Sequence, residues 1–213
     1  MVSFPGSPDA SSPKRDLFSA PKRHATDRIG LLGGSFNPAH GGHREISLEA
    51  LSVLGLDAVW WLVTPGNPLK DPGLYAPYED RLATARTVAD HHRIVVSDFE
   101  HRKGLQYTHE TLAALTDLWQ QIEFVWLMGA DSLETFHLWR NWQDIFATVP
   151  IAVFNRPGSE RAATESTAAR EFSAFKVDHD NAMAIFTREP PVWTFIGTTQ
   201  NPTSSTDIRN QRR

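Results

Sequence analysis

Short, nearly continuous apolar runs recur along this chain, and segments with helical spacing of apolar residues separate them. Strands that are apolar on both faces are typical of parallel sheets, because helices cover both sides of such a sheet. The predicted strands span residues 28–34, 58–64, 93–96, 122–128, 150–154 and 192–196. The pattern therefore predicts an α/β fold with a single doubly wound, mainly parallel sheet and helices on both faces.

Helical spacing predicts five helices, each between two of the predicted strands. They span residues 43–54, 78–91, 108–121, 138–146 and, with a weaker pattern, 165–175. Thr108 suits the N-cap of the third helix, because its hydroxyl can accept a hydrogen bond from the backbone. No regular element is predicted between residues 178 and 191, since the Pro190-Pro191 pair interrupts backbone hydrogen bonding.

The composition of the 213 residues excludes several classes of site and partner. The chain has no cysteine, which excludes disulfides, thiolate metal sites, iron–sulfur clusters and a cysteine nucleophile. Its net charge of −4 indicates no broad cationic surface for nucleic acid or for a membrane. The longest apolar stretch, residues 58–63, is too short to span a bilayer, so the expected compartment is the cytoplasm. A homo-oligomer is compatible with the sequence, which does not fix the number of copies.

The first 27 residues differ from the rest of the chain. They contain five Ser and four Pro with almost no apolar clustering, so they cannot bury enough surface to offset the entropy of ordering. We expect residues 1–27 to form a mobile tail and residues 28–213 to form the folded domain. A transit peptide is an alternative because basic residues are present, but Asp9, Asp16 and the lack of amphipathic periodicity count against it.

A glycine-rich turn follows the first predicted strand, with the sequence GGSFNPAHGGH over residues 33–43. It is neither a Walker loop nor a GxGxxG dinucleotide turn. Glycines let the backbone approach an anion closely, and the helix that begins near Gly41 directs free N–H groups toward the loop. His40 and His43 share one face of that helix start, because they are three residues apart. The turn therefore predicts a phosphate-binding site.

Two other interpretations of the histidine pair stay open at this point. The pair could bind zinc, although no third ligand stands nearby in the sequence. The two residues could also be ordinary polar surface residues, which is the favoured interpretation of such a pair taken alone. The glycine-rich turn around them favours the phosphate site, since a turn of this kind usually serves a particular backbone geometry.

The turn resembles the GGxFxPxHxGH signature of nucleotidyltransferases related to class I aminoacyl-tRNA synthetases, and within that group the bacterial nicotinate-nucleotide adenylyltransferases. Three further stretches carry the resemblance in the same order along the chain. They are TPGNPLK at residues 64–70, GADSL at residues 129–133 with Trp139 beyond it, and SSTDIR at residues 204–209. The resemblance covers about residues 28–209.

The resemblance implies that the phosphate of nicotinate mononucleotide attacks the α-phosphorus of ATP in line, giving deamido-NAD and pyrophosphate. No protein nucleophile is needed, and positioning and charge stabilisation would supply the catalysis. The implied catalytic residues are His40, His43 and Arg209, with His43 expected in an exposed position. Mg²⁺ is the implied cofactor, bound mainly through phosphate oxygens and water with no dedicated protein ligand.

The resemblance also implies two sets of binding residues. The ATP set comprises Gly33, Gly34, Ser35, Phe36, His40, His43, Gly129, Asp131, Ser204, Ser205, Thr206 and Arg209. The nicotinate mononucleotide set comprises Lys70, Tyr107, Thr108, Trp139 and Arg156. Trp139 would stack on the pyridine ring, and Tyr107 with Thr108 would recognise its carboxylate end. Asp131 would accept hydrogen bonds from ribose, and it could also cap a helix that begins at Ser132.

The remaining tryptophans have plainer interpretations. Trp60, Trp61 and Trp126 lie inside apolar runs and are expected in the core. Trp142 would support Trp139 from the same face of one helix, because three residues separate them.

Two alternatives to this function stay open. One is another small-molecule nucleotidyltransferase of the same fold, with nicotinamide mononucleotide or pantetheine phosphate as the acceptor. The other is a non-catalytic regulator that binds a nucleotide, against which the presence of His40, His43 and Arg209 argues.

Overall fold

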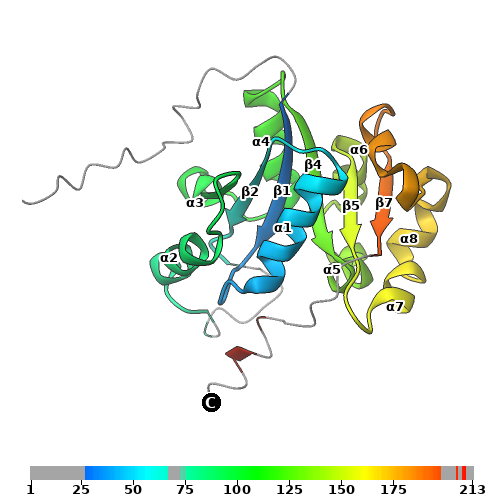
Figure 1. The fold of residues 1–213 in the computed structure, drawn as a ribbon. Helices are drawn as coiled ribbons and strands as arrows, with labels where there is room; N and C mark the ends of the chain where they lie inside the picture. Colours follow the sequence, from blue (N-terminus) through cyan, green and yellow to red (C-terminus); the bar gives the residue numbers. More distant parts are fainter. Residues whose placement is uncertain (1–26, 67–72, 74, 198–204, 206–207, 210–213) are drawn as a thin grey trace, which may run out of the picture.

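The computed structural model describes residues 27–66, 73, 75–197, 205 and 208–209. Its centre is one seven-stranded sheet in the order β3-β2-β1-β4-β5-β7-β6, and every pair of neighbouring strands is parallel (Figure 1). The strands are β1 (Arg28–Gly34), β2 (Ala58–Val63), β3 (Ile94–Ser97), β4 (Glu123–Gly129), β5 (Ile151–Phe154), β6 (Lys176–Val177) and β7 (Trp193–Ile196). The predicted fold class is thus confirmed. The predicted tail lies outside the described residues, apart from Asp27.

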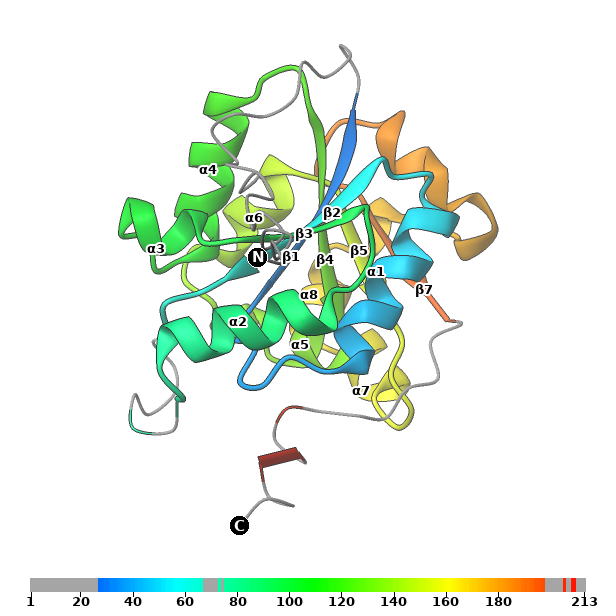
Figure 2. The ribbon, with the colours of Figure 1, turned by 60° about the vertical axis from the view of Figure 1, so that its left-hand side comes forward.

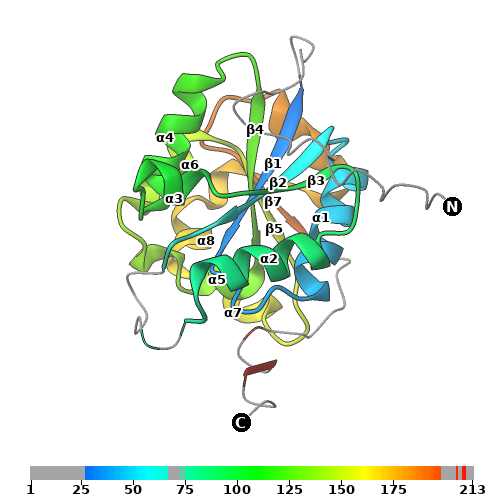
Figure 3. The ribbon, with the colours of Figure 1, turned by 90° about the vertical axis from the view of Figure 1, so that its left-hand side faces the viewer.

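Helices cover both faces of the sheet, as Figure 2 shows for α1 on one side and for α4 and α6 on the other. The first face carries α1 (Gly41–Val53), α2 (Tyr78–Val88) and the 3-10 helix η5 (His179–Phe186). The second face carries α3 (Phe99–Lys103), α4 (Thr108–Leu118), α5 (Ala130–Glu134), α6 (Trp142–Thr148), α7 (Glu160–Thr164) and α8 (Thr167–Glu171). Figure 3 shows the same layers from the side of β3 and α2.

Each central strand sends alternate side chains to the two layers, because successive residues of a strand point to opposite faces. In β2, Trp60 and Leu62 pack into the core under α4, whereas Trp61 and Val63 pack into the core under α1. All six residues of this strand are buried, which accounts for its unbroken apolar run.

The strand order reverses between β1 and β4. From β1 the chain moves outward through β2 to β3, and it then returns to β4 on the other side of β1. Loops at the carboxyl ends of β1 and β4 therefore diverge, and a crevice opens between them. Gly33 and Gly34 end β1 there, and Gly129 ends β4. The predicted phosphate loop consequently lies at the switch point of the sheet.

Two predictions about helix ends are wrong. Thr108 is the first helical residue of α4, and Tyr107 occupies the N-cap without a side-chain hydrogen bond. The predicted helix over residues 138–146 is divided: a 3-10 helix, η3 (Phe136–Leu138), ends before Trp139, and α6 begins only at Trp142. Asn141 separates them in the left-handed region with φ 51°, which asparagine tolerates better than most residues. Trp139 and Trp142 therefore do not share a helix face.

The segment after β5 is more broken than predicted. In place of one helix over residues 165–175 there are α7, α8 and a 3-10 helix, η4 (Ser173–Phe175). Ser166 divides α7 from α8, and its hydroxyl caps α8 by accepting a hydrogen bond from the Ala169 N–H at 3.2 Å. The sequence also did not predict α3, β6 or η5, which are short. None of the helices in the described ranges has the length and hydropathy of a membrane-spanning segment.

A substitution at Gly33 would test how closely β1 and β4 approach each other at the switch point. A Cβ atom at this position would overlap the Trp126 indole ring, so we expect Gly33→Ala to force that ring out of place. Overpacking of this kind costs about 1 to 3 kcal/mol, which urea unfolding would measure. Gly66→Ala is the control, because its added methyl group meets no atom within 4 Å among the described residues other than its chain neighbours. Equal unfolding midpoints for the two variants would contradict the close approach.

Candidate active site

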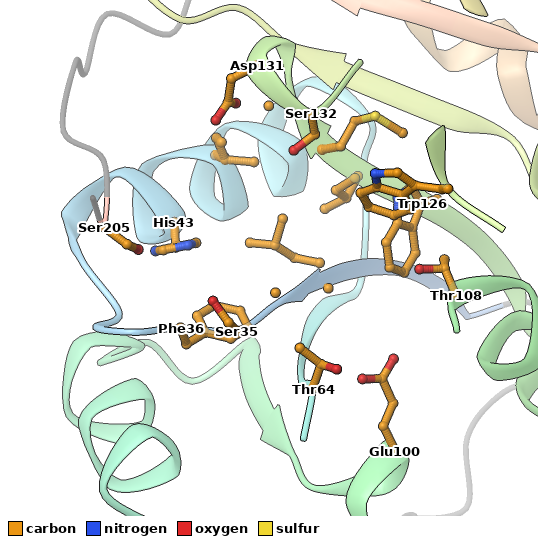
Figure 4. Close-up of a pocket in the computed structure, with 18 of the residues that line it drawn as sticks. Ser35, Phe36, His43, Thr64, Glu100, Thr108, Trp126, Asp131, Ser132 and Ser205 are labelled. Carbon is orange, nitrogen blue, oxygen red and sulfur yellow. The ribbon is translucent and has the colours of Figure 1, made fainter. Parts of the chain in front are cut away.

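A cavity of about 540 Å³ opens at the carboxyl ends of β1 and β4 (Figure 4). The residues that line it come from β1, β4 and the helices α1, α3, α4, α5 and η3, from the loops that follow β1, β2, η3 and β5, and from near the carboxyl terminus. Many of the predicted site residues are among them: Gly33, Gly34, Ser35, Phe36, His40, His43, Tyr107, Thr108, Gly129, Asp131, Trp139, Arg156, Ser205 and Arg209. Three further predicted residues, Lys70, Ser204 and Thr206, lie outside the described residues. The structure thus gathers in one cavity residues that the sequence separates widely.

His40 and His43 cap the first turn of α1 reciprocally. His40 is the N-cap residue, and its Nδ1 accepts a hydrogen bond from the Gly42 N–H at 3.2 Å. The backbone N–H of His40 in turn donates to Nδ1 of His43, also at 3.2 Å. This is the arrangement of a capping box, with two imidazoles in place of the usual hydroxyl and carboxylate. The ring centroids are 3.8 Å apart.

These bonds determine which ring nitrogens carry protons. Each Nδ1 accepts a hydrogen bond and is therefore unprotonated, so the proton of each neutral ring is on Nε2. Burial and the positive charge of Arg156 lower the pKa of His40 to about 4, against a small opposing effect of Asp131. Burial, followed by the influence of His40 and Arg156, also places the pKa of His43 well below its usual value. Both rings are thus neutral at pH 7, and each keeps one Nε2–H donor.

His43 is half-buried, so the expectation of an exposed position is wrong. Its ring packs on Phe36, with the centroids 4.7 Å apart, and Phe36 is itself stacked on Trp61 at 4.9 Å. Phe36 has a φ of 46°, a conformation that non-glycine residues adopt rarely and that the surrounding packing must hold. The Trp61 indole donates to the Ser47 hydroxyl, and that hydroxyl donates to the His43 carbonyl oxygen, both at 2.8 Å.

Residues near the carboxyl terminus contact the loop between β1 and α1. The Ser205 hydroxyl donates to the Pro38 carbonyl oxygen at 2.9 Å, and the Arg209 guanidinium donates to the Asn37 carbonyl oxygen. Figure 4 shows Ser205 beside His43. The first and last motifs of the sequence therefore meet at the loop before α1, and the Arg209 guanidinium lines the same cavity as the two imidazoles.

Asp131 and Arg156 form an ion pair at the rim of the cavity. The Arg156 guanidinium lies 3.4 Å from the Asp131 carboxylate, with Arg156 largely buried and Asp131 about half exposed. The prediction that Asp131 caps a helix is wrong, because α5 begins at Ala130 and Gly129 is its N-cap. Asp131 lies instead in the first turn of α5, where a carboxylate is favoured by the helix dipole and remains accessible from the cavity.

Aromatic residues form the other end of the cavity. Trp139 is half-buried and lies edge-on to Trp126, with the ring centroids 6.4 Å apart. Trp126 is buried, as predicted for a core residue, yet it also lines the cavity, and its Nε1–H has no acceptor among the described residues. The Arg140 guanidinium lies 4.7 Å from the centroid of the Tyr107 ring. Arg140 was not predicted, because its place depends on how the chain turns after η3.

Arg81 is a second residue that sequence reasoning missed. It is only 2% exposed, and its guanidinium donates to four backbone carbonyl oxygens. These belong to Ser35, Thr64, Pro65 and Ala76, at 2.6, 2.9, 2.7 and 3.1 Å. Arg81 thereby connects the loops that follow β1 and β2. The signal for it was an arginine on the apolar face of α2, one residue before Leu82 and four before Ala85.

Glu100 is the third missed residue. It is 6% exposed and lines the cavity, and its carboxyl oxygen lies 2.9 Å from the Thr111 hydroxyl. Burial raises the pKa of Glu100 to about 7, against the opposing effect of hydrogen bonds from Thr111 and Thr64. The sequence carried no signal for this role beyond an acidic residue next to Phe99, since α3 itself was not predicted.

The buried guanidinium of Arg81 gives a prediction about stability. Arg81→Lys should destabilise the fold by at least about 2 kcal/mol, because a single ammonium group cannot reach all four carbonyl oxygens and unpaired buried acceptors are costly. Arg86→Lys, an exposed position on the same helix, is the matched control and should change the unfolding free energy by no more than about 0.5 kcal/mol. Similar urea midpoints for both variants would show that Arg81 does not hold the two loops.

Comparison with known proteins agrees with the geometry. A family model described as cytidylyltransferase-like matches residues 31–211. A protein of Methylorubrum extorquens (strain PA1), named "Probable nicotinate-nucleotide adenylyltransferase", is 47% identical over 184 residues, which cover 86% of this chain and all of that protein. A protein of Rhizobium meliloti (strain 1021) with the same name is also 47% identical, over 86% of this chain and 98% of its own length.

Solved structures agree in fold. Two structures of Plasmodium falciparum nicotinic acid mononucleotide adenylyltransferase, one complexed with APC and one with NaAD, superpose with TM-scores of 0.62 and 0.64. Each covers 86% of this chain and 83% of that chain at 15% identity, a likeness that supports the fold alone. The family match and the curated relatives go further: the chain belongs to the cytidylyltransferase-like family, among the proteins named nicotinate-nucleotide adenylyltransferases.

Proposed function

We propose that the protein transfers the adenylyl group of ATP to nicotinate mononucleotide, forming deamido-NAD and releasing pyrophosphate. The observation that carries this proposal is the pair of neutral imidazoles at the start of α1, which line one cavity together with Arg209 and Arg156. The names of the curated relatives support the same reaction. A biosynthetic reaction of this kind fits the cytoplasm, which we propose as the compartment.

The cationic end of the cavity is suited to a triphosphate. Negative charge grows on the oxygens around the α-phosphorus as the second nucleotide attacks in line, and fixed donors stabilise that charge without reorganising. The Nε2–H groups of His40 and His43 are such donors, because the capping bonds hold both rings. Arg209 would bind the outgoing pyrophosphate. Ser205 lines the same cavity, and we propose that it adds hydroxyl or backbone donors together with Ser204 and Thr206 of the same sequence motif.

Mg²⁺ fits this end of the cavity only as a companion of the phosphates. Imidazole and guanidinium groups attract anions, whereas Mg²⁺ prefers oxygen ligands. Within the described ranges, no group of three His, Asp or Glu side chains is arranged to hold a metal ion. When bound to the ATP phosphates, Mg²⁺ would neutralise part of the charge that develops on pyrophosphate. The protein would then contact the metal through ATP and water.

The aromatic end of the cavity is suited to a pyridine ring with a carboxylate. Trp139 is half-buried beside Trp126 and would stack on the ring. The side chain of the N-cap residue Tyr107 does not cap α4, so the first N–H groups of the helix can receive the carboxylate together with the Thr108 hydroxyl. We propose Tyr107 and Thr108 for this contact, and Lys70 or Arg156 for the mononucleotide phosphate. Asp131 would accept hydrogen bonds from a ribose.

Pyrophosphate release is the direct test of the function. The protein is incubated with ATP and Mg²⁺ and with one acceptor at a time: nicotinate mononucleotide, nicotinamide mononucleotide or pantetheine phosphate. We expect pyrophosphate and an adenylylated product with nicotinate mononucleotide, at a kcat/KM well above those of the other two. Faster release with pantetheine phosphate would assign another acceptor, and ATP binding without release from any acceptor would favour a regulator.

His40 lets the structural and catalytic roles of an imidazole be separated. Asparagine is among the best N-cap residues, so His40→Asn should keep the stability of the wild type while removing the Nε2–H donor. We expect its kcat to fall about 10² to 10³-fold, the usual effect of losing one such donor. His40→Ala should lose the same activity and also about 1 kcal/mol of stability, measured by urea unfolding. Nearly normal turnover of His40→Asn would refute the assigned role.

A further inference from the structure

A carboxyl group lies at the end of the cavity where the proposed ligand brings its own carboxylate. Glu100 extends from α3, is 6% exposed and lines the cavity. Figure 4 shows its carboxyl group pointing into the cavity, with Thr64 on one side and Thr108 on the other. Glu100 has no cationic partner among the described residues. The mechanism described above makes no use of it.

One hydroxyl group is hydrogen-bonded to this carboxyl group and a second lies beside it, and each has another acceptor. The Thr111 hydroxyl lies 2.9 Å from the Glu100 carboxyl oxygen and 3.3 Å from the Tyr107 carbonyl oxygen. The Thr64 side chain lies beside Glu100 in Figure 4, and its hydroxyl donates to the Gly66 carbonyl oxygen at 3.1 Å. A hydroxyl has only one hydrogen to donate. An ionised Glu100 can accept both hydrogens, whereas a protonated Glu100 can donate to one hydroxyl, which then donates to its carbonyl.

The surroundings allow either state near neutral pH. Burial raises the pKa of Glu100 to about 7, and the two hydroxyls oppose that effect. Titratable and charged groups on the neighbouring elements include Tyr78, Glu79 and Arg81 of α2, Asp98, His101, Arg102 and Lys103 at α3, Tyr107, His109 and Glu110 at α4, and Arg140 after η3. The buried Arg81 donates to four backbone carbonyl oxygens, His101 stacks on Tyr78, and Arg102 pairs with Asp98 at 2.8 Å.

We propose that Glu100 is a specificity-determining residue that takes up one proton when the acid mononucleotide binds. The inference rests on the proposed function. Two carboxylates in one water-poor pocket repel each other, and the first turn of α4 can stabilise one anion there. The ligand carboxylate takes that place, and Glu100 then takes up a proton from the buffered solvent, keeps it, and donates a hydrogen bond to the Thr111 or Thr64 hydroxyl. The amide mononucleotide brings no such charge and leaves the protonation of Glu100 unchanged.

The preference for acid over amide must therefore depend on pH. Both mononucleotides share the phosphate and the pyridinium charge and differ only in the carboxylate. The ratio of their kcat/KM values consequently cancels the titration of ATP, of the phosphate and of the histidines. Below the pKa of Glu100 the ratio is constant, because the proton is already present. Above it, the ratio falls by up to tenfold for each pH unit.

The first experiment measures this ratio from pH 6 to pH 9 in the wild type, in Glu100→Gln and in Asp98→Asn. Asp98→Asn is the matched control, since it removes one negative charge beside the same helix and does not line the cavity. We expect the ratio to fall at least tenfold between pH 7 and pH 9 in the wild type and in Asp98→Asn. In Glu100→Gln it should change less than twofold, because the amide of glutamine does not titrate.

A second experiment needs no variant. Calorimetry of the wild-type protein with each mononucleotide at pH 8, in HEPES and in Tris, measures the protons bound on association. We expect close to one proton for the acid and none for the amide. Equal proton uptake for both ligands, or a ratio that falls equally in Glu100→Gln, would overturn the inference. Adenylyl transfer to neither mononucleotide would instead overturn the proposed function.

Discussion

Two hydrogen bonds between His40 and the first turn of α1 determine the chemistry of the site. They end the loop after β1, begin the helix and leave both Nδ1 atoms without protons. The same bonds that stabilise the helix start therefore aim two neutral Nε2–H donors away from the helix. Burial and the charge of Arg156 keep the rings neutral, so these donors persist at physiological pH. The Nδ1 atoms of His40 and His43 thus stabilise the helix start, and the Nε2–H groups of the same two rings are the proposed donors to the substrate.

The two ends of the cavity differ in charge and in the kind of side chain that lines them. Arg156 influences both imidazoles and Arg209 contacts the loop that precedes them, at the end of the cavity where an ATP triphosphate would be received. The other end has aromatic rings, an uncapped helix and the buried Glu100. Arg81 connects the loops that follow β1 and β2, because its guanidinium donates hydrogen bonds to backbone carbonyl oxygens of both loops. The Arg81 guanidinium therefore fixes the positions of two loops of the site, and this role requires no contact with a substrate.

The sequence predicted what local pattern can determine. Apolar runs located the main strands, and the glycine-rich turn located the start of α1 and its two histidines. The predictions failed where a contact joins distant segments: Arg81 and Ser35 are 46 residues apart, so no local pattern reveals their bond. The predicted helix over residues 138–146 ran through Asn141, because apolar periodicity gives no sign that one residue adopts a left-handed conformation. The protonation of Glu100 could not be predicted, since it follows from burial that only the fold creates.

The most direct test of the central claim is the protonation state of the two imidazoles in solution. Nitrogen-15 NMR of histidine-labelled protein at pH 7 distinguishes the two neutral tautomers from the imidazolium ion, and the variants His40→Asn and His43→Asn assign the signals of the two residues. The account predicts that both Nδ1 atoms are unprotonated and both Nε2 atoms protonated, with the Nε2 signals shifting when a non-hydrolysable ATP analogue binds. An imidazolium ion at either position, or a proton on Nδ1, would contradict it.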